Sequence, residues 1–168
     1  MNAVVQPLKV RPSTIAMVMA YEHPGLVERL QEKMLLSEDE AKTLFQDTKR
    51  FLFLCSISKK PLAPSAQIDE CWHNFILFTK DYDRFCNEHF NTFIHHRPKT
   101  LAERASSDGT IVKETVAIAR DVFGDNVLTQ NWSYRRNGTG ESPICDDNID
   151  NCQGSTNCQS STSDPPDK

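Results

Sequence analysis

Hydrophobic residues recur every three or four positions along most of the first 130 residues, which is the spacing of one face of an α-helix. No stretch of the first 108 residues shows a sustained alternation of apolar and polar positions, and Gly25 is the only glycine there. Both features favour helices over strands. The chain is therefore predicted to be an all-α protein.

Two helices are predicted within the first 60 residues. One begins near Pro24, whose missing N–H group is harmless in a first helical turn, and ends at about Leu35. The other spans Glu38–Ile57 and has the clearest start signal of the chain, because Ser37 and Glu40 form the S-x-x-E pattern of a capping box. Its apolar stripe, which is expected to face the core, comprises Ala41, Leu44, Phe45, Thr48, Phe51, Leu52 and Cys55.

A third helix is predicted as one long element over Ala66–Phe90. Ser65 is a suitable N-cap before it, and Asn91 is a suitable left-handed residue after it. Apolar side chains occupy more than one face of this helix, so it is expected to be central and covered on several sides. It should pack against the preceding helix, with Trp72 and Tyr82 at the junction.

The last predicted helix lies in TIVKETVAIARDVFG and ends at Gly124, and the composition changes after Trp132. The following residues contain almost no large apolar side chain and are rich in Ser, Thr, Asn, Asp, Gly and Pro. Such a segment cannot bury enough apolar surface to offset the entropy lost on ordering. We expect a compact bundle of about four to five helices over residues 12–132, followed by a disordered, acidic, cysteine-containing tail over residues 133–168.

The formal net charge is −4, and most of it belongs to the tail, which has three basic and six acidic residues. The helical part is close to neutral, so its charge gives no support for nucleic-acid binding. No run approaches the roughly 20 apolar residues of a membrane span. The stretch Ile15–Ala20 is also too short for the apolar region of a secretory signal. The chain is therefore predicted to be cytoplasmic, without a membrane association.

The six cysteines divide into two groups. Three lie in apolar helical surroundings and are expected to be reduced, buried thiols: Cys55, Cys71 and Cys86. Three lie in the polar tail at spacings unlike those of zinc knuckles: Cys145, Cys152 and Cys158. The sequence leaves the role of the tail cysteines open.

Four of the five histidines fall between residues 70 and 98. Asp69 and His73 are four residues apart, so on a helix they share a face. They could bind one metal ion together, or the carboxylate could orient the imidazole as an outer partner. His95 and His96 follow after a turn and could fold back to complete three or four ligands. These four residues are the candidate metal site.

The alternative is a structural role. Asp69 would then simply pair with a partly exposed His73 near the helix start, where a carboxylate also suits the helix dipole. Lys80 and Arg84 are expected to project from nearly the same side of the long helix as His73, which argues against a dedicated cation site. No H-x₃-H or C-x₂-C pair reinforces a metal site. On the sequence alone, the structural role is favoured.

No catalytic residue is predicted. Cys86 and His89 could pair as nucleophile and base, but the thiol faces the predicted apolar side, where it stays protonated. The aromatic residues of the long helix have the spacing of a core rather than of a base-stacking platform. A calcium-loop-like run that begins at Asp146 lacks the required glycine and bidentate glutamate.

The segment WHNFILFTKDYDRFCNEHFNTFIHH resembles the signature of the glycine-rich domain-containing protein-like family. The matching positions are Asp69, Trp72, His73, Leu77, Tyr82, Cys86, Phe90, Asn91, Ile94, and His95 or His96. Phe75 stands where many members have a second histidine, Asn91 stands where the family has glycine, and the glycine-rich region itself is absent. The resemblance implies a fold more than an activity, because the biochemical role of that family is largely undefined.

The leading functional prediction is a non-enzymatic binding or interaction module, for which a protein would be the partner. It rests on the lack of a convincing nucleophile–base pair, phosphate loop or cofactor fingerprint in the sequence. The alternative is a metal-binding protein or metal-dependent enzyme built on Asp69, His73, His95 and His96. Their side chains would then have to converge within about 5 Å. The sequence leaves any cofactor, the substrate and the oligomeric state open.

Overall fold

A computed structural model of the protein describes residues 14–97, 100, 102 and 109–133. These residues form α-helices and short 3₁₀-helices without a strand, which confirms the all-α fold class. The α-helices are α1 (Ile15–Ala20), α2 (Pro24–Met34), α3 (Glu38–Ile57), α4 (Ala66–Ile76), α5 (Thr79–Phe90) and α7 (Thr110–Phe123), followed by the 3₁₀-helices η1 (Asp125–Val127) and η2 (Gln130–Trp132). Apart from Ser133, the tail predicted to be disordered lies outside the described residues, as do its three cysteines.

Local capping signals place most helix ends where the sequence predicts them. The α3 capping box is present: the Ser37 hydroxyl oxygen accepts from the Glu40 N–H group at 3.3 Å, and the Glu40 carboxylate accepts from the Ser37 N–H group at 2.8 Å. Helix α2 begins at Pro24, preceded by His23, whose Nδ1 accepts from the Leu26 N–H group at 2.9 Å. Helix α5 ends at Asn91 in the left-handed conformation, at φ 56° and ψ 24°.

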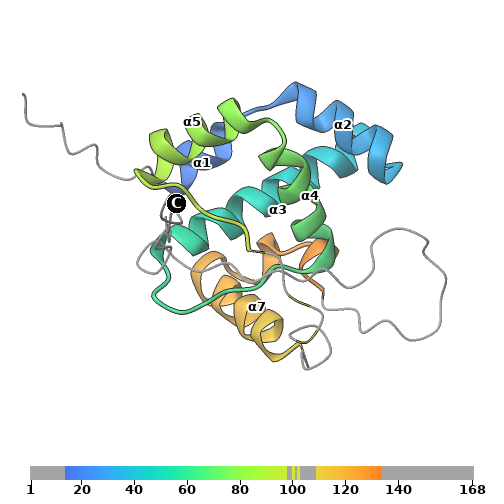
Figure 1. Cartoon of the computed structure of the whole chain (residues 1–168). Coiled ribbons are helices and arrows are strands. Elements are labelled where there is room, and N and C mark those ends of the chain that lie inside the picture. The colour runs from blue at the N-terminus through green and yellow to red at the C-terminus, as the bar shows by residue number, and fades with distance from the viewer. Residues whose placement is uncertain (1–13, 98–99, 101, 103–108, 134–168) are drawn as a thin grey trace, which may run out of the picture.

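Helix α3 is the centre of the bundle and contacts α1, α2, α4 and η2. In Figure 1 it crosses the middle of the molecule, with α7 on one side and α2 and α5 on the other. Helix α7 is joined to this centre by the Phe53–Phe123 ring pair, with centroids 6.3 Å apart. A hydrogen bond of 3.0 Å from the Ala63 N–H group to the Thr115 hydroxyl fixes the same helix to the α3–α4 connection. The central helix therefore organises both sides of the fold.

Two charged residues of α3 are fully buried and hold neighbouring segments in place. The Lys49 amino group donates to the carbonyl oxygens of Met19 and Tyr21, at 2.7 and 2.6 Å, and so fixes the connection from α1 to α2. Burial lowers the pKa of Lys49 to about 8. The Asp47 carboxylate accepts from the Asn131 side-chain amide at 3.0 Å and anchors η2. These contacts explain why short helices with little apolar surface are held on the bundle.

The prediction of a single long helix over Ala66–Phe90 is wrong. The structure has two helices, α4 and α5, separated at Leu77 and Phe78, where Phe78 adopts ψ 60°. In one continuous helix, Trp72 and Tyr82 would be about 15 Å apart along the axis. In the structure the Trp72 Nε1 atom donates to the Tyr82 hydroxyl oxygen at 2.9 Å. The break thus folds α5 back on α4, and this packing outweighs the local preference for a continuous helix.

The short helix α1 is an element that the sequence pattern does not predict. Its six residues carry one fully buried side chain, Val18, and its contacts are mainly with α3. Together, α1 and the division of the long helix raise the number of α-helices in the described residues to six, above the four to five expected.

Candidate metal centre

Asp69 and His73 of the candidate site lie one turn apart on α4. The helix starts after Ser65, whose hydroxyl oxygen accepts from the Ile68 N–H group at 3.3 Å, so Asp69 falls in the first turn, where the helix dipole favours a carboxylate. The Asp69 side chain is only 2% exposed, whereas that of His73 is 30% exposed. The helix therefore supplies one buried carboxylate and one imidazole that is open to solvent.

His96 reaches the same place from the segment that follows α5. The left-handed Asn91 ends α5 and reverses the chain. Three residues later, the Ile94 carbonyl oxygen accepts a hydrogen bond of 2.6 Å from the Tyr82 hydroxyl, which itself accepts from the Trp72 indole. This chain of hydrogen bonds fixes the returning segment against α4, two residues before His96.

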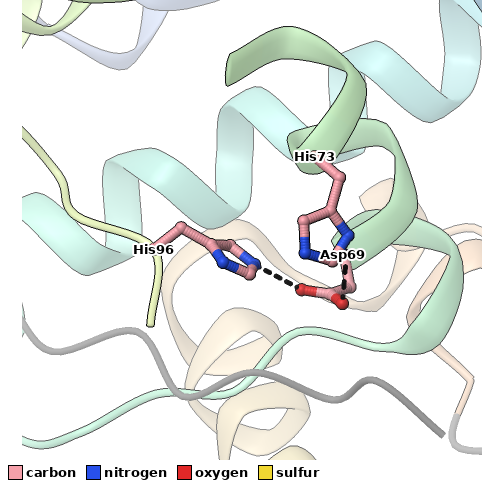
Figure 2. Close-up of side chains that lie close together, drawn as sticks. All are labelled: Asp69, His73 and His96. Carbon is pink, nitrogen blue, oxygen red and sulfur yellow. Dashed lines mark hydrogen bonds and ion pairs between the residues drawn. The ribbon is translucent and has the colours of Figure 1, made fainter. Parts of the chain in front are cut away.

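The three side chains form a compact cluster. The His96 Nε2 atom lies 3.0 Å from Asp69 Oδ1, and the His73 Nδ1 atom lies 3.6 Å from Asp69 Oδ2. The two imidazole rings have centroids 4.2 Å apart. Ligand atoms of all three residues lie within 4.8 Å of one another. Figure 2 shows the carboxylate joined to both rings, while the second ring nitrogen of His73 faces His96.

Trp72 forms the inner wall of the cluster. It has no exposed surface, and its ring meets the His96 ring in a T-shaped contact with centroids 4.4 Å apart. The His96 side chain is consequently only 6% exposed. One side of the cluster is thus closed off by buried side chains, and access from solvent is on the His73 side.

The comparison with protein families matches the family described as UCP032817-like, over residues 14–121. The chain belongs to this family. The matched region runs from the start of α1 into α7 and contains the whole cluster. Comparisons with curated proteins and with solved structures found no match.

His95 is the one predicted ligand that does not join the cluster in this UCP032817-like chain. It is exposed, and its ring packs against Phe93 with centroids 4.7 Å apart. The adjacent His96 takes the inward position instead. Of the four residues proposed from the sequence, the structure therefore brings together Asp69, His73 and His96.

The sequence argument against a cation site depended on the continuous helix and does not hold. Lys80 and Arg84 belong to α5, which is a separate helix from the α4 segment carrying His73. Arg84 is paired with Asp81 on its own helix. Two cations projecting from the His73 face were expected only because the two helices were treated as one.

The cysteines of the UCP032817-like region are buried, as predicted: Cys55, Cys71 and Cys86. Burial raises the pKa of Cys71 to about 12, so this neighbour of Trp72 stays a neutral thiol rather than a thiolate ligand. For the Cys86–His89 pair, Cys86 has no exposed surface that a substrate could reach. Burial also lowers the pKa of His89.

The calcium-like run near Asp146 lies outside the described residues.

Sequence reasoning missed a polar network beside His73. The Glu70 carboxylate lies 3.9 Å from His73 Nδ1 and accepts from the Asn74 side-chain amide at 2.9 Å. Arg29 of α2 donates from Nε to the Asn74 side-chain oxygen at 2.7 Å. The i, i+3 and i, i+4 spacings of Glu70, His73 and Asn74 were visible in the sequence, but the contribution of α2 was not.

Among the described residues, no helix is both long and apolar enough to cross a membrane.

Proposed function

We propose that the chain is a metal-binding protein, with Asp69, His73 and His96 as ligands of one divalent transition-metal ion. The observation that carries this proposal is the convergence of their ligand atoms within 4.8 Å. Ligands at about 2.0–2.1 Å from one zinc ion are roughly 3.3 Å apart. Small side-chain movements are therefore enough to place all three on one ion.

The chemistry of the donors indicates which ions suit the site. Two imidazole nitrogens and one carboxylate oxygen suit zinc and related transition metals, whereas calcium and magnesium prefer oxygen ligands throughout. Three protein ligands are also the number used by catalytic zinc sites, where water or substrate takes the remaining position. The finer form of the proposal is therefore a metal-dependent enzyme whose open position faces the solvent side of His73.

The resemblance to the glycine-rich domain-containing protein-like family supports the same site. Its matching positions include Asp69 and His73, together with Trp72 and Tyr82, which in the structure hold His96 in place. We propose that this motif encodes the metal ligands and the aromatic support behind them. A motif that places a carboxylate, two histidines and their supporting residues together is easier to explain by metal binding than by a surface ion pair.

The non-enzymatic interaction module, which is the leading prediction from the sequence, becomes the alternative proposal, with a protein partner and a cytoplasmic location as sequence-based predictions. In that case, Asp69 would serve only to pair two histidines and close the turn after α5. The two proposals differ in a measurable property, which is the affinity of the three side chains for zinc.

Zinc titration of protein purified without an affinity tag tests the proposal. We expect wild-type protein to bind one equivalent of zinc, measured by competition with a chromophoric chelator. His96→Ala should bind more than about 100-fold more weakly, since even outer partners of metal ligands contribute 10–100-fold. His95→Ala is the matched control, because it removes an adjacent but exposed imidazole, and its affinity should stay within about twofold of wild type. Equal losses in the two variants, or no zinc binding by the wild type, would contradict the proposal.

A further inference from the structure

Glu70 extends the proposed metal centre beyond its three ligands. Its Oε2 atom lies 3.9 Å from the Nδ1 atom of His73, the same nitrogen that Asp69 Oδ2 approaches at 3.6 Å. Two carboxylates therefore face one ring nitrogen, which favours a hydrogen on Nδ1. The lone pair is then on Nε2, the nitrogen that faces His96 in Figure 2.

Glu70 is itself held in this position by Asn74. The Asn74 side-chain amide donates to Glu70 Oε1 and to the Glu70 backbone carbonyl, both at 2.9 Å. Asn74 is only 4% exposed, and its oxygen accepts from Arg29 at 2.7 Å. A residue on α2 thus fixes a buried amide on α4, and the amide fixes the carboxylate beside His73.

We infer that Glu70 is a positioning residue of the metal centre, acting through His73. This inference rests on the proposed function. Asp69 already contacts His96 through Oδ1, and on binding an ion it shares its carboxylate between the metal and two histidines. Glu70 places a second carboxylate beside the His73 Nδ1 atom, and its charge favours the ring orientation with the N–H group toward the carboxylates and Nε2 toward the ion. Carboxylate–histidine–metal arrangements of this kind raise the basicity of the ligand and fix its tautomer.

The test is a double-mutant cycle on zinc affinity. Glu70→Gln should weaken zinc binding by about 10–100-fold in the wild-type background, the usual cost of losing an outer partner. In the His73→Ala background, the same substitution should change the remaining affinity by less than about twofold, because the residue through which Glu70 acts has been removed. Glu32→Gln, an exposed change of the same charge on α2, is the control and should have no effect in either background.

The outcomes separate the possible explanations. An equal loss in both backgrounds would mean that Glu70 acts only as a nearby negative charge, and this would overturn the inference. Unchanged affinity of Glu70→Gln in a wild-type protein that binds zinc would overturn it too, while leaving the proposed function intact. Failure of the wild type to bind zinc would overturn both. Circular dichroism of each variant establishes that the measured protein is folded.

Discussion

Replacing Trp72 with alanine is expected to lower the free energy of unfolding by about 3–5 kcal/mol. The indole has no exposed surface, packs edge-on against Phe51 of α3 with centroids 5.7 Å apart, and also contacts the His96 ring. Its removal would leave a cavity at the junction of α3 and α4. It would also leave the Tyr82 hydroxyl without the indole N–H donor. Chemical denaturation, with the midpoint and slope compared with those of the wild type, measures the effect.

Leu77→Ala is the control for this experiment. Leu77 lies at the break between α4 and α5 and is 63% exposed, so its truncation should change stability by no more than about 0.5 kcal/mol. If Trp72→Ala were as stable as Leu77→Ala, the assignment of Trp72 to the core and to the wall of the metal centre would be wrong.

Replacing Asp47 with alanine is expected to cost a similar amount, about 3–5 kcal/mol, for an electrostatic reason. This carboxylate has no exposed surface and accepts from Arg50 at 3.0 Å, from the Thr129 hydroxyl at 2.5 Å and from the Asn131 amide at 3.0 Å. Alanine leaves three donors without their acceptor, one of them a charged guanidinium. Because two of these donors belong to the segment around η2, that segment should also detach from α3 and become more susceptible to proteolysis.

The matched control for Asp47 is Asp83, a carboxylate exposed on α5. Asp83→Ala should stay within about 0.5 kcal/mol of the wild type. Similar denaturation midpoints for the two aspartate variants would show that the contacts of Asp47 contribute nothing net to the fold.

Features determined by neighbouring residues could be predicted from the sequence. The capping box of α3, the N-cap at Ser65 and the left-handed Asn91 were all found where their local signals placed them. The apolar stripe of α3 is buried as predicted, because helical spacing alone identifies which side chains share a face.

Features determined by contacts between distant residues could not be predicted in the same way. The break at Phe78 has no glycine or proline to announce it, and it depends on Tyr82 reaching both Trp72 and the Ile94 carbonyl. The burial of Lys49 depends on carbonyl groups nearly 30 positions earlier in the chain.

The candidate site was predictable in its components and not in its geometry. The i, i+4 spacing of Asp69 and His73 was sufficient to pair them on α4. The choice between His95 and His96 depends on how the segment after α5 returns to α4, which no periodic pattern encodes. The continuous-helix interpretation also introduced Lys80 and Arg84 as false neighbours, and so made the metal site look less favourable than the structure does.

The metal content of the untagged protein tests the central claim most directly. Wild-type protein and His73→Ala would each be incubated with one equivalent of zinc, separated from unbound metal on a desalting column and analysed by mass spectrometry for metals. The wild type is expected to retain close to one zinc ion per chain, and His73→Ala is expected to retain almost none while remaining folded. A folded wild-type protein that leaves the column without zinc would show that Asp69, His73 and His96 form a structural contact and not a metal centre.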